Sequence, residues 1–269
     1  MIKLMDLLKE ELLKESVFDK SILKCVFMAG GPGSGKSYVA KEIFGMPDEK
    51  SISTKYDMKV VNSDTEFEHL LSKYGFETAQ WQTLDIDQWP DEVLLVATGE
   101  DSKGNKLDPD QLSIRDKAKQ LTKKRLKNYT EGRLGIIVDG TGHNYAKLAS
   151  KKKEMEHLGY DCYMVAVNTS LVVAKQRNST RRRALPEDIL VKSWEDVQNN
   201  LGKFQTLFRS NFKIVDNSKF LKPEQARAKF SKIMSDGINQ FITRPIKNAV
   251  GKKWIKNQTK LVKNKKRFN

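Results

Sequence analysis

Long apolar runs, cysteine clusters and histidine clusters are all missing from this chain of 269 residues. No segment approaches the roughly 18 consecutive apolar residues that a membrane-spanning helix needs, which excludes a membrane channel. The two cysteines each lie inside an apolar stretch and the three histidines are scattered, which excludes a disulfide scaffold and a structural zinc module. The first residues carry acids among their leucines, unlike a signal peptide, so we expect a cytoplasmic protein without a membrane partner.

Charge, in contrast, is plentiful and unevenly placed. Lysine and arginine number 49 against 34 acidic residues, which gives a formal net charge of +15. Residues 244–269 contain no acid, whereas residues 75–110 are strongly acidic. A basic surplus favours polyanionic partners, so nucleic acid is a possible partner of the basic tail 244–269. A tail that only keeps the chain soluble fits the composition equally well.

Strand and helix patterns alternate through the middle of the chain. Short buried strands are predicted at about 22–29, 60–61, 134–138, 163–167 and 212–215. Helical patterns follow over about 65–74, 112–131, 145–158, 170–183 and 187–207. This alternation implies right-handed crossovers and an α/β fold with a mostly parallel five-stranded sheet and helices on both faces.

The domain organisation follows from the same patterns. Apolar residues at helical spacing predict an amphipathic helix within residues 1–20. The α/β domain is expected over 21–222, with an acidic insert at 75–110, and a basic extension over 223–269.

The strongest motif lies between the first predicted strand and the next helix. It fits the phosphate-loop pattern G-x-x-x-x-G-K-[ST] and consists of Gly30, Gly31, Pro32, Gly33, Ser34, Gly35, Lys36 and Ser37. Glycines let backbone N–H groups surround a phosphate, and the following helix directs its positive end to the same point. Lys36 is placed to reach the β- and γ-phosphates, and Ser37 to ligate Mg²⁺. The motif predicts a P-loop NTPase-type fold that binds a nucleoside triphosphate, with ATP as the expected one, together with Mg²⁺.

An acid follows the third predicted strand. Ligands of open parallel sheets bind beyond the carboxyl ends of the strands, so we expect Asp139 beside Lys36 and Ser37, where it would hold Mg²⁺ or its waters. An ordinary turn aspartate is the alternative. Thr141 and Asn144, in the turn that follows, are candidate substrate residues, and Asn144 is also suited to cap the next helix.

A second acid follows the second predicted strand. Phosphate transfer to a hydroxyl needs a carboxylate that orients the hydroxyl and takes its proton. Asp64 is the candidate for this role and for contact with the acceptor. The alternative is structural, with Ser63 or Asp64 capping the helix that begins here.

Arginines are concentrated in residues 177–183. Arg177 and Arg181 are one helical turn apart and would share a helix face. Arginine stabilises charge on a transferring phosphoryl group through paired hydrogen bonds. A helical lid over the phosphate loop would supply Arg177, Arg181 and Arg183 as catalytic residues, whereas a solvated basic helix is the alternative.

On these residues the chain resembles the P-loop kinases of the zeta-toxin and phage polynucleotide-kinase group, over roughly residues 21–215. Residues 61–65 are similar to the zeta-toxin segment that carries the catalytic aspartate, here Asp64. Residues 138–141 are similar to the acid-Gly-Thr that ends the third strand of zeta toxins. Residues 177–186 resemble the lid of polynucleotide kinases.

The resemblance implies a kinase that transfers the γ-phosphate of ATP to an alcohol group. Arg177 and Arg183 stand where zeta toxins keep two phosphate-binding arginines. Phe67 replaces an arginine of polynucleotide kinases and His143 replaces an arginine of zeta toxins, so the acceptor stays open. A small molecule or nucleotide sugar is the first expectation, and a polynucleotide 5′-hydroxyl is the second. A nucleotide-dependent nucleic-acid-binding protein without kinase activity is the remaining alternative.

Overall fold

The computed structural model describes residues 17–76, 89–108, 110–180 and 185–265. Within them, five parallel strands form one sheet in the order β2-β3-β1-β4-β5. The strands are β1 (Lys24–Ala29), β2 (Lys59–Val61), β3 (Ile136–Asp139), β4 (Asp161–Asn168) and β5 (Phe212–Asp216). The expected α/β P-loop NTPase-type fold is therefore confirmed. The amphipathic helix expected near the N-terminus lies outside the described residues.

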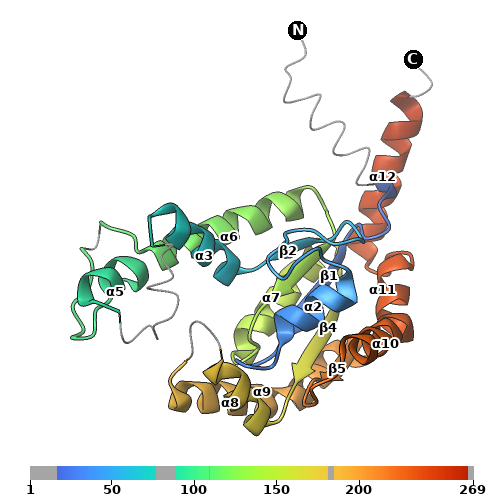
Figure 1. Cartoon of the computed structure of the whole chain (residues 1–269). Helices are drawn as coiled ribbons and strands as arrows, with labels where there is room; N and C mark the ends of the chain where they lie inside the picture. Colours follow the sequence, from blue (N-terminus) through green and yellow to red (C-terminus); the bar gives the residue numbers. More distant parts are fainter. Residues whose placement is uncertain (1–16, 77–88, 109, 181–184, 266–269) are drawn as a thin grey trace.

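Helices cover both faces of this sheet (Figure 1). They are α2 (Lys36–Phe44), α3 (Ser63–Lys73), α5 (Asp91–Thr98), α6 (Ile114–Glu131), α7 (Tyr145–His157), α8 (Leu171–Ser179), α9 (Glu187–Phe208), α10 (Pro223–Ile233), α11 (Asn239–Thr243) and α12 (Ala249–Lys265). A 3₁₀ turn, η2 (Arg209–Asn211), precedes β5, and a π-type turn, η3 (Met234–Ile238), joins α10 to α11. Among the described residues, no helix is both long and apolar enough to cross a lipid bilayer.

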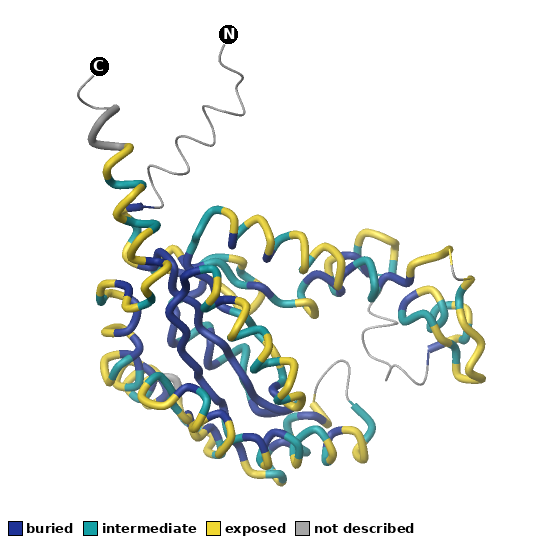
Figure 2. Tube along the Cα trace, turned by 180° about the vertical axis from the view of Figure 1, so that it is seen from behind, coloured by how far each residue is buried: buried dark blue, intermediate teal, exposed yellow. Residues whose placement is uncertain are grey.

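The sheet is buried on both faces, which explains why its central strands are apolar except at their end residues. Side chains along β1 alternate between two hydrophobic clusters, with Val26 and Met28 on one face and Cys25 and Phe27 on the other. Helices α2, α10 and α11 cover the first face, while α7 and α9 cover the second. Figure 2 shows the buried strands in the centre and the exposed residues on the outer sides of the helices.

The segment beginning at residue 223 contributes to this common core. Phe230, Ile238 and Phe241 are almost fully buried in the cluster that also contains Val26 of the central strand. The basic residues beside them lie on the outer side of the helices. The segment therefore has an apolar face although its overall composition is strongly basic. Helix α12 then extends away from the body (Figure 1).

A buried ion pair ties the start of α12 to the sheet. Lys24 at the start of β1 is 1% exposed, and its Nζ donates to Asp161 Oδ2 at 3.1 Å. The Asp161 carboxylate also accepts from the backbone N–H groups of Lys247 and Asn248, each at 2.9 Å. Burial lowers the pKa of Lys24, and the Asp161 carboxylate opposes that shift. One carboxylate thus neutralises a lysine in the sheet and fixes the segment that leads into α12.

Helices α3, α5 and α6 form an arm to one side of the sheet (Figure 1). Their contact is a third hydrophobic cluster that includes Phe67, Trp89, Ala97 and Ile114. Trp89 and α5 belong to the acidic insert 75–110, so the described part of the insert packs on α3 and α6 instead of lying alone.

Two helical glycines provide a test of how closely α12 packs against the body of the protein. A Cβ on Gly251 would lie 2.2 Å from the Gly159 carbonyl oxygen, whereas a Cβ on Gly202 would meet nothing within 4 Å. We expect Gly251→Ala to lower the free energy of unfolding by about 1–3 kcal/mol through overpacking. Gly202→Ala will raise it by about 0.5–1 kcal/mol, because alanine favours the helix. Urea unfolding measures both, and shifts of the same sign would contradict the close contact of α12 with the body.

Candidate active site

The phosphate loop connects β1 to α2 in a conformation that requires glycine. Gly33 and Gly35 have φ values of 73° and 74°, in the left-handed region. A Cβ on Gly33 would also lie 2.3 Å from the carbonyl oxygen of Ala174 in α8. Gly35 is the N-cap of α2 and supplies no side-chain cap, so the first N–H groups of the helix are left for an anion.

Contacts from three other segments hold the loop in place. The Gly30 N–H donates to the Thr141 carbonyl at 3.0 Å. The Ser34 carbonyl accepts from Asn217 Nδ2 at 2.8 Å and from an Arg177 guanidinium N–H at 3.3 Å. Asn217 is buried and follows β5 directly. The loop is therefore shaped before a ligand binds.

The ammonium of Lys36 and the carboxylate of Asp139 meet beside this loop. Lys36 Nζ contacts Asp139 Oδ1, and Asn62 Nδ2 donates to the other oxygen, Oδ2, at 2.7 Å. The pairing of Met28 with Asp139 across β1 and β3 brings the end of β3 next to the loop. Only 7% of the Asp139 side chain is exposed, so the carboxylate has a fixed orientation. Sequence reasoning placed Lys36 and Asp139 together, but it did not identify Asn62.

The residues near Lys36 suit a magnesium ion that is completed by water and phosphate. Ser37 lies in the first turn of α2, next in sequence to Lys36. Within the described ranges, no cluster of three or more histidine, cysteine or acidic side chains forms a dedicated metal site. One hydroxyl and one carboxylate are the protein ligands that Mg²⁺ uses when it is carried by a nucleotide. The donor set of Ser37 and Asp139 therefore fits Mg²⁺.

Asp64 lies at the beginning of α3, at the same edge of the sheet. Val61 of β2 pairs with Val138 of β3, so the helix that follows β2 begins beside Asp139. The N-cap of α3 is Asn62, whose Oδ1 accepts from the Asp64 N–H at 2.8 Å. The alternative in which Ser63 or Asp64 caps the helix is thus wrong, because Asn62 fills that position. The exposed Asp64 carboxylate is left available to a ligand.

The turn after β3 is fixed by hydrogen bonds. Asn144 caps α7, as expected, with Oδ1 accepting from the Lys147 N–H at 2.8 Å. The Thr141 hydroxyl contacts Nδ1 of His143. Asn200 of α9 donates to the Gly142 and His143 carbonyls at 3.1 and 2.8 Å. Thr141 is therefore next to the loop through its backbone, and the Asn144 side-chain oxygen serves the fold.

Arg177 is the arginine of the lid segment that the structure describes at this site. Its guanidinium lies over the Phe220 ring, 5.0 Å from the ring centroid, and contacts the phosphate loop. Burial lowers the pKa of this guanidinium from its usual value. The helix expected over 170–183 is present as α8 up to Ser179, and Arg181 and Arg183 lie outside the described residues.

Asn217 and Phe220 also belong to the site, and neither was identified from the sequence. Both follow the carboxyl end of β5, where ligands of parallel sheets bind. Asp64 and Asp139 were selected because they follow the carboxyl ends of strands, and the same criterion applies to residues after β5. Polar residues directly after the last strand were thus a signal that could have identified Asn217.

Comparison with known proteins gives one family and several distant structures. The family model AAA_33, described as an AAA domain, matches residues 25–203. No curated protein matches the sequence. Similar solved structures include the AvrRxo1-ORF1:AvrRxo1-ORF2 complex with sulphate ions, at 13% identity and a TM-score of 0.48, covering 94% of this chain and 85% of that chain.

Two further structures resemble the chain at a similar level. The PezAT chromosomal toxin-antitoxin system of Streptococcus pneumoniae has 11% identity and a TM-score of 0.43, covering 82% of this chain and 88% of that chain. Shikimate kinase from Acinetobacter baumannii in complex with shikimate has 15% identity and a TM-score of 0.38, covering 81% and 94%.

Proposed function

Since the chain belongs to the AAA domain family AAA_33, we propose that it is an ATP-dependent kinase that transfers the γ-phosphate to a hydroxyl group of a small molecule or nucleotide sugar. The observation that carries this proposal is the meeting of Lys36 and Asp139 at the phosphate loop, with Asp64 at the start of the neighbouring helix. A loop that only senses nucleotides needs no second carboxylate near it to take a proton.

On the nucleotide side, the N–H groups at the start of α2 and the Lys36 ammonium bind the β- and γ-phosphates. Lys36 must leave Asp139 to reach them, which frees Asp139 Oδ1 while Asn62 keeps the carboxylate oriented through Oδ2. Ser37 and Asp139 would hold Mg²⁺, which when bound offsets the negative charge of the phosphates. The initial Lys36–Asp139 contact thus preserves both groups in position until nucleotide binds.

On the acceptor side, Asp64 accepts the proton of the attacking hydroxyl and orients its oxygen toward the γ-phosphate. Thr141 is the second candidate for contact with the acceptor, since its carbonyl accepts from the Gly30 N–H of the loop. Charge on the transferring group is stabilised by Arg177, together with Arg181 and Arg183 of the lid segment. Asn144 stays in the proposal only as the residue that fixes this turn.

A polynucleotide acceptor is the second candidate, and one feature favours it. Helix α12 exposes a row of basic residues, namely Lys252, Lys253, Lys256 and Lys260. Such a row binds the phosphate backbone of nucleic acid without regard to sequence.

Labelled ATP tests the proposal directly. The purified chain is incubated with γ-labelled ATP, Mg²⁺ and, in separate reactions, a metabolite extract, nucleotide sugars or an oligonucleotide with a 5′-hydroxyl. Label in the extract or the nucleotide sugars supports the first acceptor class, and label in the oligonucleotide supports the second. A chain that binds ATP and labels none of the three pools would contradict kinase activity.

A further inference from the structure

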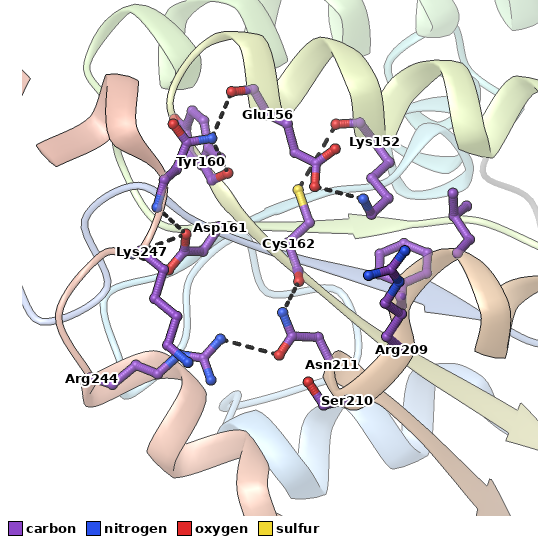
Figure 3. Close-up of a pocket in the computed structure, with 13 residues that line it drawn as sticks. Lys152, Glu156, Tyr160, Asp161, Cys162, Arg209, Ser210, Asn211, Arg244 and Lys247 are labelled. Atoms are coloured by element: carbon purple, nitrogen blue, oxygen red, sulfur yellow. Dashed lines mark hydrogen bonds and ion pairs between the residues drawn. The ribbon is translucent and has the colours of Figure 1, made fainter.

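Figure 3 shows a polar pocket of about 450 Å³. It lies at the opposite end of the sheet from the phosphate loop, because its lining includes the first residues of β4, whereas the loop follows the last residue of β1. Asp161 and Cys162, which begin β4, and η2, which precedes β5, form part of its wall. The other wall comes from α7 and from the segment 244–248 that leads into α12. Since β4 is 8 residues long, the pocket lies about 25 Å from the candidate active site.

Basic side chains dominate the lining of this pocket. They are Lys152, Arg209, Arg244 and Lys247, against the acids Glu156 and Asp161.

Both acids are already engaged by the fold. Asp161 is paired with Lys24 and with the backbone before α12, and Glu156 accepts from Lys152 at 2.6 Å. Among the described residues, no carboxylate pairs with the side chains of Arg209, Arg244 or Lys247. Three cations therefore line the pocket without a carboxylate partner among the described residues; Arg209 and Lys247 are exposed and Arg244 is half-buried.

The Arg244 guanidinium is held in place but incompletely hydrogen-bonded. It lies 5.1 Å from the centroid of the Phe241 ring, and Nη2 donates to Asn211 Oδ1 at 3.1 Å. Its Nε is buried and has no acceptor within the described part of the chain. Buried N–H groups are nearly always paired, so this donor points to a missing acceptor.

Arg209 occupies a backbone conformation that favours glycine. Its φ and ψ are 52° and −121°, and it ends α9. A side chain in this region strains the backbone, and such strain is typical of functional positions. Within the described ranges, the Arg209 side chain forms no hydrogen bond or ion pair that would explain its presence. Glycine at position 209 would remove the backbone strain. Arginine at this position instead provides a guanidinium group that could bind a ligand.

We propose that this pocket binds a phosphate group, with the guanidinium groups of Arg209 and Arg244 and the ammonium of Lys247 as its ligands. Guanidinium groups match the oxygens of phosphate in pairs, and an ammonium adds a point charge. The group belongs to a small phosphorylated molecule or to a nucleic-acid backbone that continues along the lysines of α12. The site is separate from the phosphate loop and does not depend on kinase activity.

The variants Arg209→Gly and Lys247→Ala remove two of the three cations without disturbing the core. Glycine relieves the strain at position 209, and the structural contacts of Lys247 are made by its backbone. Lys232→Ala is the matched control, because Lys232 is exposed on α10 and lies outside the pocket. Lys36→Ala identifies binding at the phosphate loop.

Calorimetric titration with pyrophosphate should show two sites on the native chain, only the pocket site on the Lys36→Ala chain, and an unchanged loop site with a weakened pocket site on the doubly substituted chain. The affinity of the pocket site should fall at least about tenfold in the double variant, the scale for losing a charged hydrogen bond. Arg209→Gly should not lower Tm. A single pyrophosphate site that only Lys36→Ala removes would overturn the proposal, as would weaker binding accompanied by a lower Tm in Arg209→Gly.

A labelled single-stranded oligonucleotide distinguishes the two sources of phosphate. If the double variant also weakens oligonucleotide binding, and lowers the slope of log K against log salt by about 1 or more, the pocket receives a backbone phosphate. If only pyrophosphate binding falls, the ligand is a small phosphorylated molecule. Unchanged binding of both probes would overturn the proposal.

Discussion

Replacing Asp64 by asparagine will slow phosphate transfer about 10²–10⁴-fold and leave the affinity for ATP nearly unchanged. Asparagine keeps the size of the side chain but cannot take a proton. The fold will tolerate the change, because Asn62 rather than Asp64 caps α3 and the Asp64 carboxylate is exposed. Single-turnover assays with labelled ATP measure the transfer rate, and equilibrium titration measures ATP binding.

Asp110→Asn is the matched control for this prediction. Asp110 is also exposed, and it belongs to the acidic insert, so the substitution removes the same charge. Its rate should remain within about twofold of the native rate, since surface charges act weakly across water. Native-like transfer by the Asp64→Asn chain would reject Asp64 as the base.

Lys36→Ala will weaken ATP binding and slow transfer about 10²–10³-fold. The ammonium is the basic side chain of the phosphate-loop motif, and loss of one such charge-stabilising donor costs about 10²–10³-fold in rate. The change also leaves the Asp139 carboxylate, which is 7% exposed, without the cation that contacts it. A moderate loss of stability will therefore accompany the loss of activity.

A double variant tests the loss of stability by itself. Adding Asp139→Asn to Lys36→Ala removes the unpaired charge, so Tm should recover toward the native value while activity does not return. Lys41→Ala, on the same helix, controls for loss of a lysine from α2. Recovery of activity together with Tm would mean that Lys36 acts only by supporting the fold.

The sheet and the phosphate loop were predictable from the sequence for a physical reason. Strands of a parallel sheet are buried on both faces, so the interiors of β1, β3 and β4 are continuous apolar runs with polar residues only at their ends. The glycines at 33 and 35 are fixed by left-handed backbone, and the spacing to Lys36 is fixed by the start of α2. Because all strands point the same way, acids that follow them were expected to meet at one edge.

Other features of the fold and the site could not be predicted, because they depend on contacts that are not visible in the composition or in local sequence patterns. Phe230 and Phe241 stand among basic residues, so the segment after 223 does not look like part of a core. The cap at Asn62 competes with two equally suitable neighbours, and only the backbone decides between them. The phosphate pocket joins residues of α7, η2 and the segment before α12, which no local pattern connects.

The buried pair of Lys24 and Asp161 has a consequence for synthesis on the ribosome. The central strand emerges early with its lysine, but the carboxylate that neutralises it emerges with β4, and the segment that completes the carboxylate's hydrogen bonds comes later still. The apolar side of α2 likewise waits for α10 and α11. A nascent chain therefore exposes part of its core until α11 has been synthesised, and we expect chains that stop before α11 to require chaperones or be degraded.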